Sequence, residues 1–130
     1  PYINGWDKDF SISHSRDISI VAVASEAIGI DIEDNGRDID LEKFKRTGFL
    51  NFDECAYKNK EEFFARFTAL EAYLKYIGKG FHKDARAISV RKDGAGIVID
   101  DGEEIKAEVI RDGAYTIAIV TGKTPRNRWD

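Results

Sequence analysis

The feature that most constrains the fold is one long run with helical spacing, set between two regions with strand-like sequence. Apolar residues recur there at intervals of four, three, four and three positions, which places them on one face of an α-helix. They are Phe63, Phe67, Leu70, Leu74 and Ile77. Gly78 follows directly, and glycine commonly ends a helix. The spacing predicts an amphipathic helix over Lys60–Ile77 that must cover an apolar surface supplied by the rest of the chain.

Strand-like runs on both sides of this helix supply such a surface. Those before it are FSISHS, DISIVAVAS and EAIGIDIE. Those after it are ARAISVRKDG, AGIVIDDG, EEIKAEVIRDG and AYTIAIVT, separated by Asp-Gly steps that favour turns. Two short helices are predicted between the two groups, one over Leu41–Arg46 and one that begins near Asn51 or Asp53. This order predicts an α+β fold, an antiparallel sheet with a long helix packed across it.

Length and composition limit the classes of function. The chain has 130 residues, so we expect a single domain over 1–122 and a loose tail over 123–130. A net charge of -4, with Lys and Arg interleaved with acids, argues against a nucleic-acid-binding module. No run is long and apolar enough to span a membrane. Cys55 is the only cysteine, which excludes an intrachain disulfide and suits the reducing cytoplasm.

The segment GIDIED, residues 29–34, places three carboxylates where a buried strand is expected to end. Alternate side chains of a strand share a face, so Asp31 and Glu33 point the same way, with Cβ atoms roughly 6–7 Å apart. Glu71 flanks the apolar stripe of the predicted helix and is the natural third ligand. A few hard oxygen ligands that leave places for water and phosphate favour Mg²⁺. The alternative, that the acidic pair only decorates a solvent-exposed face, stays open.

Residues 31–42, DIEDNGRDIDLE, also nearly match the calcium-binding loop of an EF-hand, with Gly36 at position six and Glu42 at position twelve. Two features oppose this interpretation. The segment before the loop has a β pattern where an EF-hand requires a helix, and Glu33 stands where the shorter Asp or Asn is usual. A calcium-binding module therefore remains as an alternative, and it predicts a preference for Ca²⁺ over Mg²⁺.

Three motifs in this order resemble the 4'-phosphopantetheinyl transferase superfamily, and more closely its surfactin-type branch. They are FSISHS at 10–15, GIDIE at 29–33 and FTALEAYLKYIGKG at 67–80. The resemblance implies the corresponding α+β fold. It also implies transfer of the phosphopantetheine arm of coenzyme A to a serine of an acyl, peptidyl or aryl carrier protein, with release of adenosine 3',5'-bisphosphate.

The resemblance also implies roles for individual residues. Asp31, Glu33 and Glu71 would hold Mg²⁺ on the pyrophosphate of coenzyme A. As catalytic residues, Glu71 would help to take the proton of the carrier serine and Lys75 would neutralise the leaving phosphate. The residues implied to contact coenzyme A are Ser13, His14, Lys75 and Lys79. Ser13 and His14 would contact its 3'-phosphate.

Two departures from the family pattern bear on activity. Leu70 stands where the family has a lysine, and its place on the apolar stripe explains why Leu is tolerated there. Members of the surfactin-type branch consist of two similar halves, and this chain matches only one. We expect two or three copies to associate, as in the short holo-acyl-carrier-protein-synthase branch. The alternative is a fragment or a non-catalytic relative that binds nucleotide or carrier protein without transfer.

Overall fold

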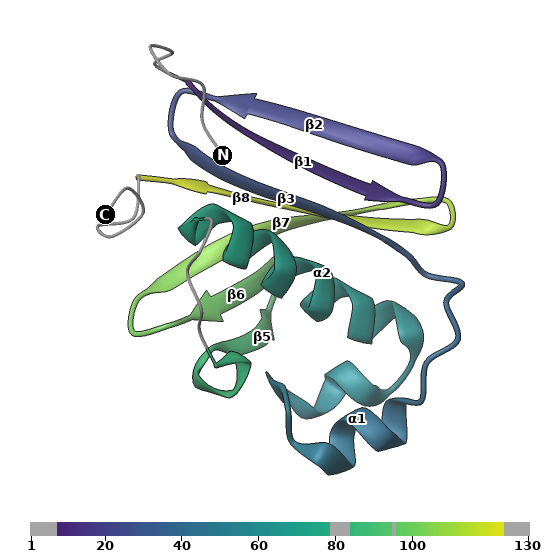
Figure 1. The fold of residues 1–130 in the computed structure, drawn as a ribbon. Helices are drawn as coiled ribbons and strands as arrows, with labels where there is room; N and C mark the ends of the chain where they lie inside the picture. Colours follow the sequence, from purple (N-terminus) through teal and green to yellow (C-terminus); the bar gives the residue numbers. More distant parts are fainter. Residues whose placement is uncertain (1–7, 79–83, 95, 124–130) are drawn as a thin grey trace.

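The computed structural model describes residues 8–78, 84–94 and 96–123 (Figure 1). Its strands are β1 (Asp9–Ser15), β2 (Ile18–Ala24), β3 (Ala27–Asp34), β4 (Asn51–Phe52), β5 (Ser89–Asp93), β6 (Gly96–Asp100), β7 (Glu104–Asp112) and β8 (Tyr115–Gly122). Its helices are α1 (Leu41–Thr47) and α2 (Lys60–Ile77), with short 3₁₀ helices η1 (Glu54–Tyr57) and η2 (Ala85–Ala87). The expected tail lies almost wholly outside the described residues, so the domain boundary stays a prediction.

A six-stranded sheet forms the centre of the molecule, in the order β3-β8-β7-β6-β5-β4. All neighbouring strands are antiparallel except β4 and β5, which run parallel. Helix α2 packs across one face of this sheet, and α1 lies at the end of the molecule opposite the β1–β2 hairpin (Figure 1). The predicted α+β architecture is therefore confirmed.

The boundaries of the helices agree with the sequence in two of three places. Helix α1 begins at Leu41, and α2 covers Lys60–Ile77 with Gly78 at its end. The third predicted helix is reduced to the single 3₁₀ turn η1. The residues just before it form β4, which pairs with β5, so sheet hydrogen bonds outweigh the local capping signal at Asn51.

Helix α2 is buried on more of its circumference than the predicted stripe. Small residues on a second face, Ala65, Ala69 and Ala72, are buried in the core that α2 shares with the sheet. Backbones approach closely there: a Cβ added at Gly29 of β3 would lie 2.0 Å from the carbonyl oxygen of Ala72. On another side, the Phe63 ring packs against aromatic rings from α1, β4, η1 and α2 itself. The helix has apolar neighbours on two sides, which a single stripe does not describe.

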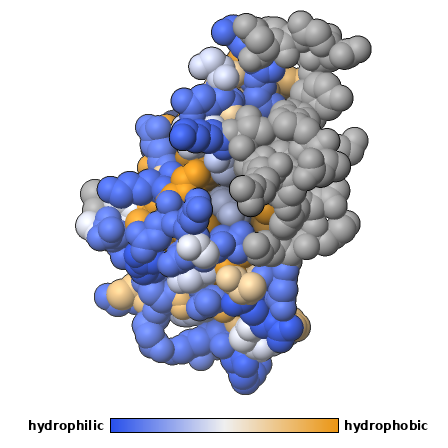
Figure 2. All heavy atoms as spheres, turned by 90° about the vertical axis from the view of Figure 1, so that its left-hand side faces the viewer, coloured by the Kyte–Doolittle hydropathy of each residue, from blue (hydrophilic) through white to orange (hydrophobic). Residues whose placement is uncertain are grey.

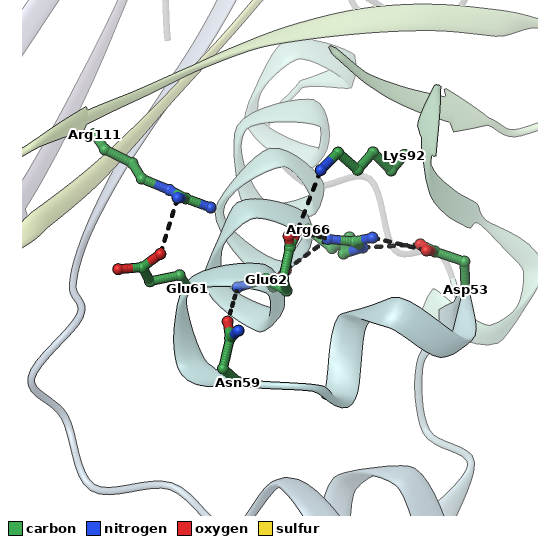
Figure 3. A network of polar contacts seen from close by, with 7 residues as sticks. All are labelled: Asp53, Asn59, Glu61, Glu62, Arg66, Lys92 and Arg111. Carbon is green, nitrogen blue, oxygen red and sulfur yellow. Dashed lines mark hydrogen bonds and ion pairs between the residues drawn. The ribbon is translucent and has the colours of Figure 1, made fainter. Parts of the chain in front are cut away.

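A polar network holds the N-terminal half of α2 in place (Figure 3). Arg66 is fully buried and donates two hydrogen bonds to Asp53, at 2.8 and 2.7 Å, and another to Glu62 at 3.1 Å. Lys92 of β5 and Arg111 of β7 form ion pairs with the first turn of the helix. Burial and bidentate geometry make the Arg66 contacts stronger than surface ion pairs. The network connects α2 to the strands at its N-terminal end.

The β1–β2 hairpin forms a separate two-stranded sheet that packs along β3. Side chains of β1, rather than its backbone, accept the hydrogen bonds of the β3 amides. The pairs are Ile28 N to Asp9 Oδ2 (2.9 Å), Ile30 N to Ser11 Oγ (3.0 Å) and Ile32 N to Ser13 Oγ (3.2 Å). We call these three acceptors the β1 side-chain ladder.

The opposite face of the hairpin is apolar and exposed. Ile12 is 52% exposed, Val21 62% and Val23 50%, and Ile12 pairs directly with Val21 across the two strands. Strand β2 contains no charged residue and pairs only with β1 among the described strands. Uncharged edge strands with exposed apolar side chains readily associate with other chains.

Elsewhere charged residues cover much of the surface, as expected for a chain with 34% Asp, Glu, Lys and Arg. On the face shown in Figure 2 hydrophilic residues predominate, and hydrophobic ones appear as small areas between them. Neither helix of the described ranges combines the length and the apolar character needed to cross a membrane.

Candidate active site

The predicted acidic residues lie where three elements meet: the hairpin, β3 and the C-terminal half of α2. Asp31 projects from β3 and is only 5% exposed. Glu71 and Lys75 come from α2, which Gly29 allows to lie directly against β3. A carboxylate is rarely buried to this degree without charged or hydrogen-bonding partners.

The two oxygens of Asp31 have different surroundings. Oδ1 accepts a hydrogen bond from Ser13 Oγ at 2.9 Å and an ion-paired one from Lys75 Nζ at 3.3 Å. Oδ2 is buried and has no hydrogen-bond partner among the residues that the structure describes. Leaving a buried charged oxygen unpaired is costly, so the site favours a further cationic or donor group at Oδ2.

Glu33 lies beside Asp31 on the same face of β3, as predicted. Burial, and then the neighbouring Asp31 carboxylate, raise the pKa of Glu33 from 4.5 to about 7. Arg37 opposes this shift and contacts Glu33 Oε1 through Nη1 at 2.5 Å. Two carboxyl groups this close share either a proton or a cation.

Glu71 is electrostatically connected to the pair. Burial and then the charge of Asp31 raise the pKa of Glu71, while Lys75 lowers it. Within residues 8–78, 84–94 and 96–123, however, no three acidic, His or Cys side chains converge closely enough to form a metal site. The structure places Asp31 and Glu33 on the same face of β3, and the charge of Asp31 acts on Glu71.

The chemistry of these residues fits a hard divalent cation. The donors are carboxylate oxygens, and one of them is buried with no hydrogen-bond partner among the described residues. Burial and the charge of Asp31 raise the pKa values of Glu33 and Glu71, although Arg37 and Lys75 partly oppose these shifts. A bound cation would pair with Oδ2 of Asp31 and would also stabilise the charged forms of Glu33 and Glu71. The prediction that Asp31, Glu33 and Glu71 hold Mg²⁺ stays a prediction.

Lys75 connects α2 to the hairpin as well as to Asp31. Its Nζ donates to the carbonyl oxygen of Ile12 at 3.2 Å, in addition to its contact with Asp31. Its side chain remains about one-third exposed, so Lys75 is accessible from solvent. A cation held in this way could meet an incoming phosphate.

The residues predicted to contact coenzyme A are separated in the structure. The Ser13 side chain faces β3 and is buried, whereas His14 lies on the opposite, exposed face of the hairpin. Lys79 lies outside the described residues. The structure therefore does not bring Ser13 and His14 to one surface.

Two interpretations from the sequence can be compared directly with the structure. Leu70 is 2% exposed and belongs to the main core, which confirms that this position faces the interior. The segment that resembled an EF-hand begins inside strand β3, and no helix precedes it in the described chain. The helix–loop–helix context of an EF-hand is therefore missing.

Sequence reasoning missed two features of the site. Arg37 follows the strand in a turn, where its spacing from Glu33 carries no signal of contact. The second feature is the inward orientation of Asp9, Ser11 and Ser13 toward β3. The sequence did carry a signal for it, because polar and apolar residues alternate along DFSISHS with a period of two. That alternation indicates a strand with a polar inner face, the reverse of the usual orientation.

Comparison with known proteins supports the assignment suggested by these residues. The sequence model of the 4'-phosphopantetheinyl transferase superfamily matches residues 27–120. This chain belongs to that superfamily. The matched region contains Asp31, Glu33, Glu71 and Lys75, whereas Ser13 and His14 precede it.

Individual members of the superfamily are similar at a moderate level. The chain is 30% identical over 104 residues to the 4'-phosphopantetheinyl transferase gsp of Aneurinibacillus migulanus, covering 76% of this chain and 43% of that protein. It is 37% identical over 79 residues to a holo-[acyl-carrier-protein] synthase of Anaplasma marginale strain St. Maries, covering 52% of this chain and 66% of that protein. The chain thus spans less than two-thirds of the length of these relatives.

Proposed function

We propose that this chain transfers the 4'-phosphopantetheine group of coenzyme A to a serine of an acyl or peptidyl carrier protein. The observation that carries the proposal is the buried Asp31 carboxylate, beside Glu33 and in contact with Lys75, whose Oδ2 has no hydrogen-bond partner among the described residues. Membership of the superfamily supports the same chemistry.

In the proposed reaction the serine Oγ forms a bond to the phosphorus that carries the pantetheine. The bond from that phosphorus to the bridging oxygen breaks, and adenosine 3',5'-bisphosphate leaves with the electron pair. The serine proton passes to Glu71, whose raised pKa makes it a better acceptor near neutral pH. Lys75 neutralises charge on the leaving phosphate, as expected where catalysis depends on positioning and cationic stabilisation.

Asp31, Glu33 and Glu71 are the residues that would hold Mg²⁺. Bound there, the ion would supply positive charge to the pyrophosphate of coenzyme A. The protein's own contribution is to bury these carboxylates between the hairpin and α2, where they attract a cation strongly. The contacts of Ser13 and His14 with the 3'-phosphate stay predictions, as does the contact of Lys79 with coenzyme A.

We also propose that copies of the chain associate. The exposed apolar face of the hairpin and the uncharged edge of β2 support this proposal. Association would cover Ile12, Val21 and Val23, which are otherwise in contact with water. Two or three copies would satisfy the expectation from the sequence.

Leu70 favours a second candidate, a relative that binds nucleotide or carrier protein without transfer. Its side chain is buried in the core, so no cation at this position reaches the site. If the family's lysine is needed for transfer, this chain lacks it. The retained set of Asp31, Glu33, Glu71 and Lys75 favours the enzyme.

The deciding experiment measures the intact mass of a panel of apo-carrier proteins after incubation with this chain, coenzyme A and Mg²⁺. A gain of one phosphopantetheine unit, absent when the metal is chelated, is the expected result. If no carrier gains mass from a folded sample while the chain still binds coenzyme A, the non-catalytic candidate replaces the enzyme.

A further inference from the structure

The one proton of the Ser13 hydroxyl is used in a hydrogen bond within the protein. The hydroxyl donates its proton to Asp31 Oδ1 at 2.9 Å and accepts the amide N–H of Ile32 at 3.2 Å. A serine hydroxyl has one proton to donate. While that proton lies on Asp31, it cannot also be donated to a phosphate of coenzyme A.

We infer that Ser13 is a positioning residue, which holds the Asp31 carboxylate so that Oδ2 is the oxygen left for the divalent cation. The inference rests on the proposed function and adds a determinant of cation binding to it. Ser13 and Lys75 both bind Oδ1, from β1 and from α2. With Oδ1 held from two elements, Oδ2 is the oxygen that is left buried and without a hydrogen-bond partner within the described residues.

The β1 side-chain ladder explains why Ser13 is itself held firmly. The Ser13 oxygen accepts a hydrogen bond from the amide of Ile32, the residue after Asp31 on β3. The packing of β1 against β3 therefore places the Ser13 hydroxyl beside the Asp31 carboxylate. Partners of this kind, which orient a metal-binding side chain, typically change metal affinity by about 10–100-fold when removed.

Ser11 provides a matched control on the same strand. It is buried, and its Oγ accepts the Ile30 amide at 3.0 Å in the same way as Ser13 accepts Ile32. Among the described residues its hydroxyl contacts no carboxylate. S11A and S13A therefore each remove one rung of the ladder, but only S13A releases Asp31.

The test uses Mn²⁺ alone as the probe, with free Mn²⁺ followed by electron paramagnetic resonance. We expect S13A to weaken Mn²⁺ binding about tenfold. S13T, which keeps a hydroxyl, should recover most of the affinity, and S11A should stay within about twofold of the wild type. Thermal melts of all three variants check that the fold is intact and that the two Ala variants lose similar stability.

A second measurement separates positioning from phosphate contact. Binding of coenzyme A and of 3'-dephospho-coenzyme A is compared for wild type and S13A in the presence of Mn²⁺. A positioning role predicts that S13A weakens both ligands by the same factor. Selective loss of coenzyme A affinity would assign Ser13 to the 3'-phosphate and overturn the inference.

The remaining outcomes are also decisive. Equal effects of S13A and S11A on Mn²⁺ affinity, or no binding of Mn²⁺ by the wild type, overturn the inference whether or not the wild type transfers phosphopantetheine. A selective effect of S13A in a protein that modifies no carrier keeps the inference and rejects the proposed function.

Discussion

At the scale of single residues, the three carboxyl groups of the site, Asp31, Glu33 and Glu71, differ in their surroundings. Asp31 is stabilised by Ser13 and Lys75 at one oxygen only. Glu33 and Glu71 lie near that negative charge in partly buried positions, and both have raised pKa values. Like charges in a site of low dielectric repel strongly. Burial first, and then this repulsion, raises both pKa values and is the physical basis for two of our predictions.

Replacing Glu71 with Gln should lower the rate of phosphopantetheine transfer by about 10²–10⁴-fold, the usual contribution of a general base. The melting temperature at pH 8 should stay the same or rise, because repulsion with Asp31 is removed. Transfer is measured by carrier mass and stability by circular dichroism. E108Q, which changes an exposed residue of β7, serves as the control. Transfer by E71Q within threefold of the wild type would exclude Glu71 as the base.

The raised pKa of Glu33 predicts how stability changes with pH in metal-free buffer. The folded protein keeps the Glu33 proton up to about pH 7, whereas the unfolded chain releases it near 4.5. Unfolding therefore releases a proton in this range, so the free energy of unfolding should fall as pH rises from about 4.5 to 7 and then level off. Urea titrations at several pH values measure the slope, and E33Q should make it shallower, because the raised pKa of Glu71 contributes a slope of the same sign. Parallel profiles for the two proteins would contradict the shift.

At the scale of elements, the site depends on two unusually close contacts with β3. The β1 side-chain ladder sets the hairpin on one side. On the other side α2 approaches so closely that only glycine fits at position 29. The Arg66 network fixes the far end of the same helix (Figure 3). Together these contacts determine where Glu71 and Lys75 lie relative to Asp31.

Replacing Gly29 with Ala should destabilise the protein by about 3 kcal/mol or more, at or above the upper end of typical overpacking costs. The added Cβ would lie 2.0 Å from Ala72 O and 2.5 Å from Tyr76 N, so the helix must move away from β3. Urea unfolding measures the change. G96A is the matched control, because its nearest heavy atom would be 3.8 Å away, and it should change stability by less than about 1 kcal/mol. Equal effects of the two substitutions would refute close packing at Gly29.

At the scale of the whole molecule, the polar and apolar faces of the hairpin are reversed relative to an ordinary surface hairpin. The polar residues of β1 face inward and serve β3, so its apolar residues face outward. The resulting surface lies on the outer side of the element that covers the site. Assembly of the chain and the geometry of the site are thereby linked through one hairpin.

Light scattering after size exclusion should find the wild type at two or three times its monomer mass. Val21→Lys, which places a charge in the centre of the exposed apolar face, should shift the protein to the monomer. Ser19→Lys adds the same charge to the same face, beside exposed His14, and should not. A wild type that stays monomeric at high concentration would remove the support for self-association.

Local sequence determined most of the elements of this protein. The spacing from Phe63 to Ile77, the Asp-Gly turns and the alternation in GIDIED each depend on neighbours in the chain, so helix α2, the closing strands and the shared face of Asp31 and Glu33 could be predicted. The motifs also indicated the superfamily. Strand β4 at Asn51–Phe52 could not be predicted, because it forms only by pairing with β5, a strand far away in the sequence.

Only the tertiary structure decided how the site is arranged. The contact between Ser13 and Asp31 joins residues 18 positions apart, and the one between Lys75 and Asp31 joins residues 44 positions apart. The burial that raises the pKa values of Glu33 and Glu71 likewise comes from elements packed together, not from adjacent residues. Sequence pattern specifies which groups are available, whereas distance and desolvation, which set their protonation and partners, exist only once the hairpin, β3 and α2 have packed.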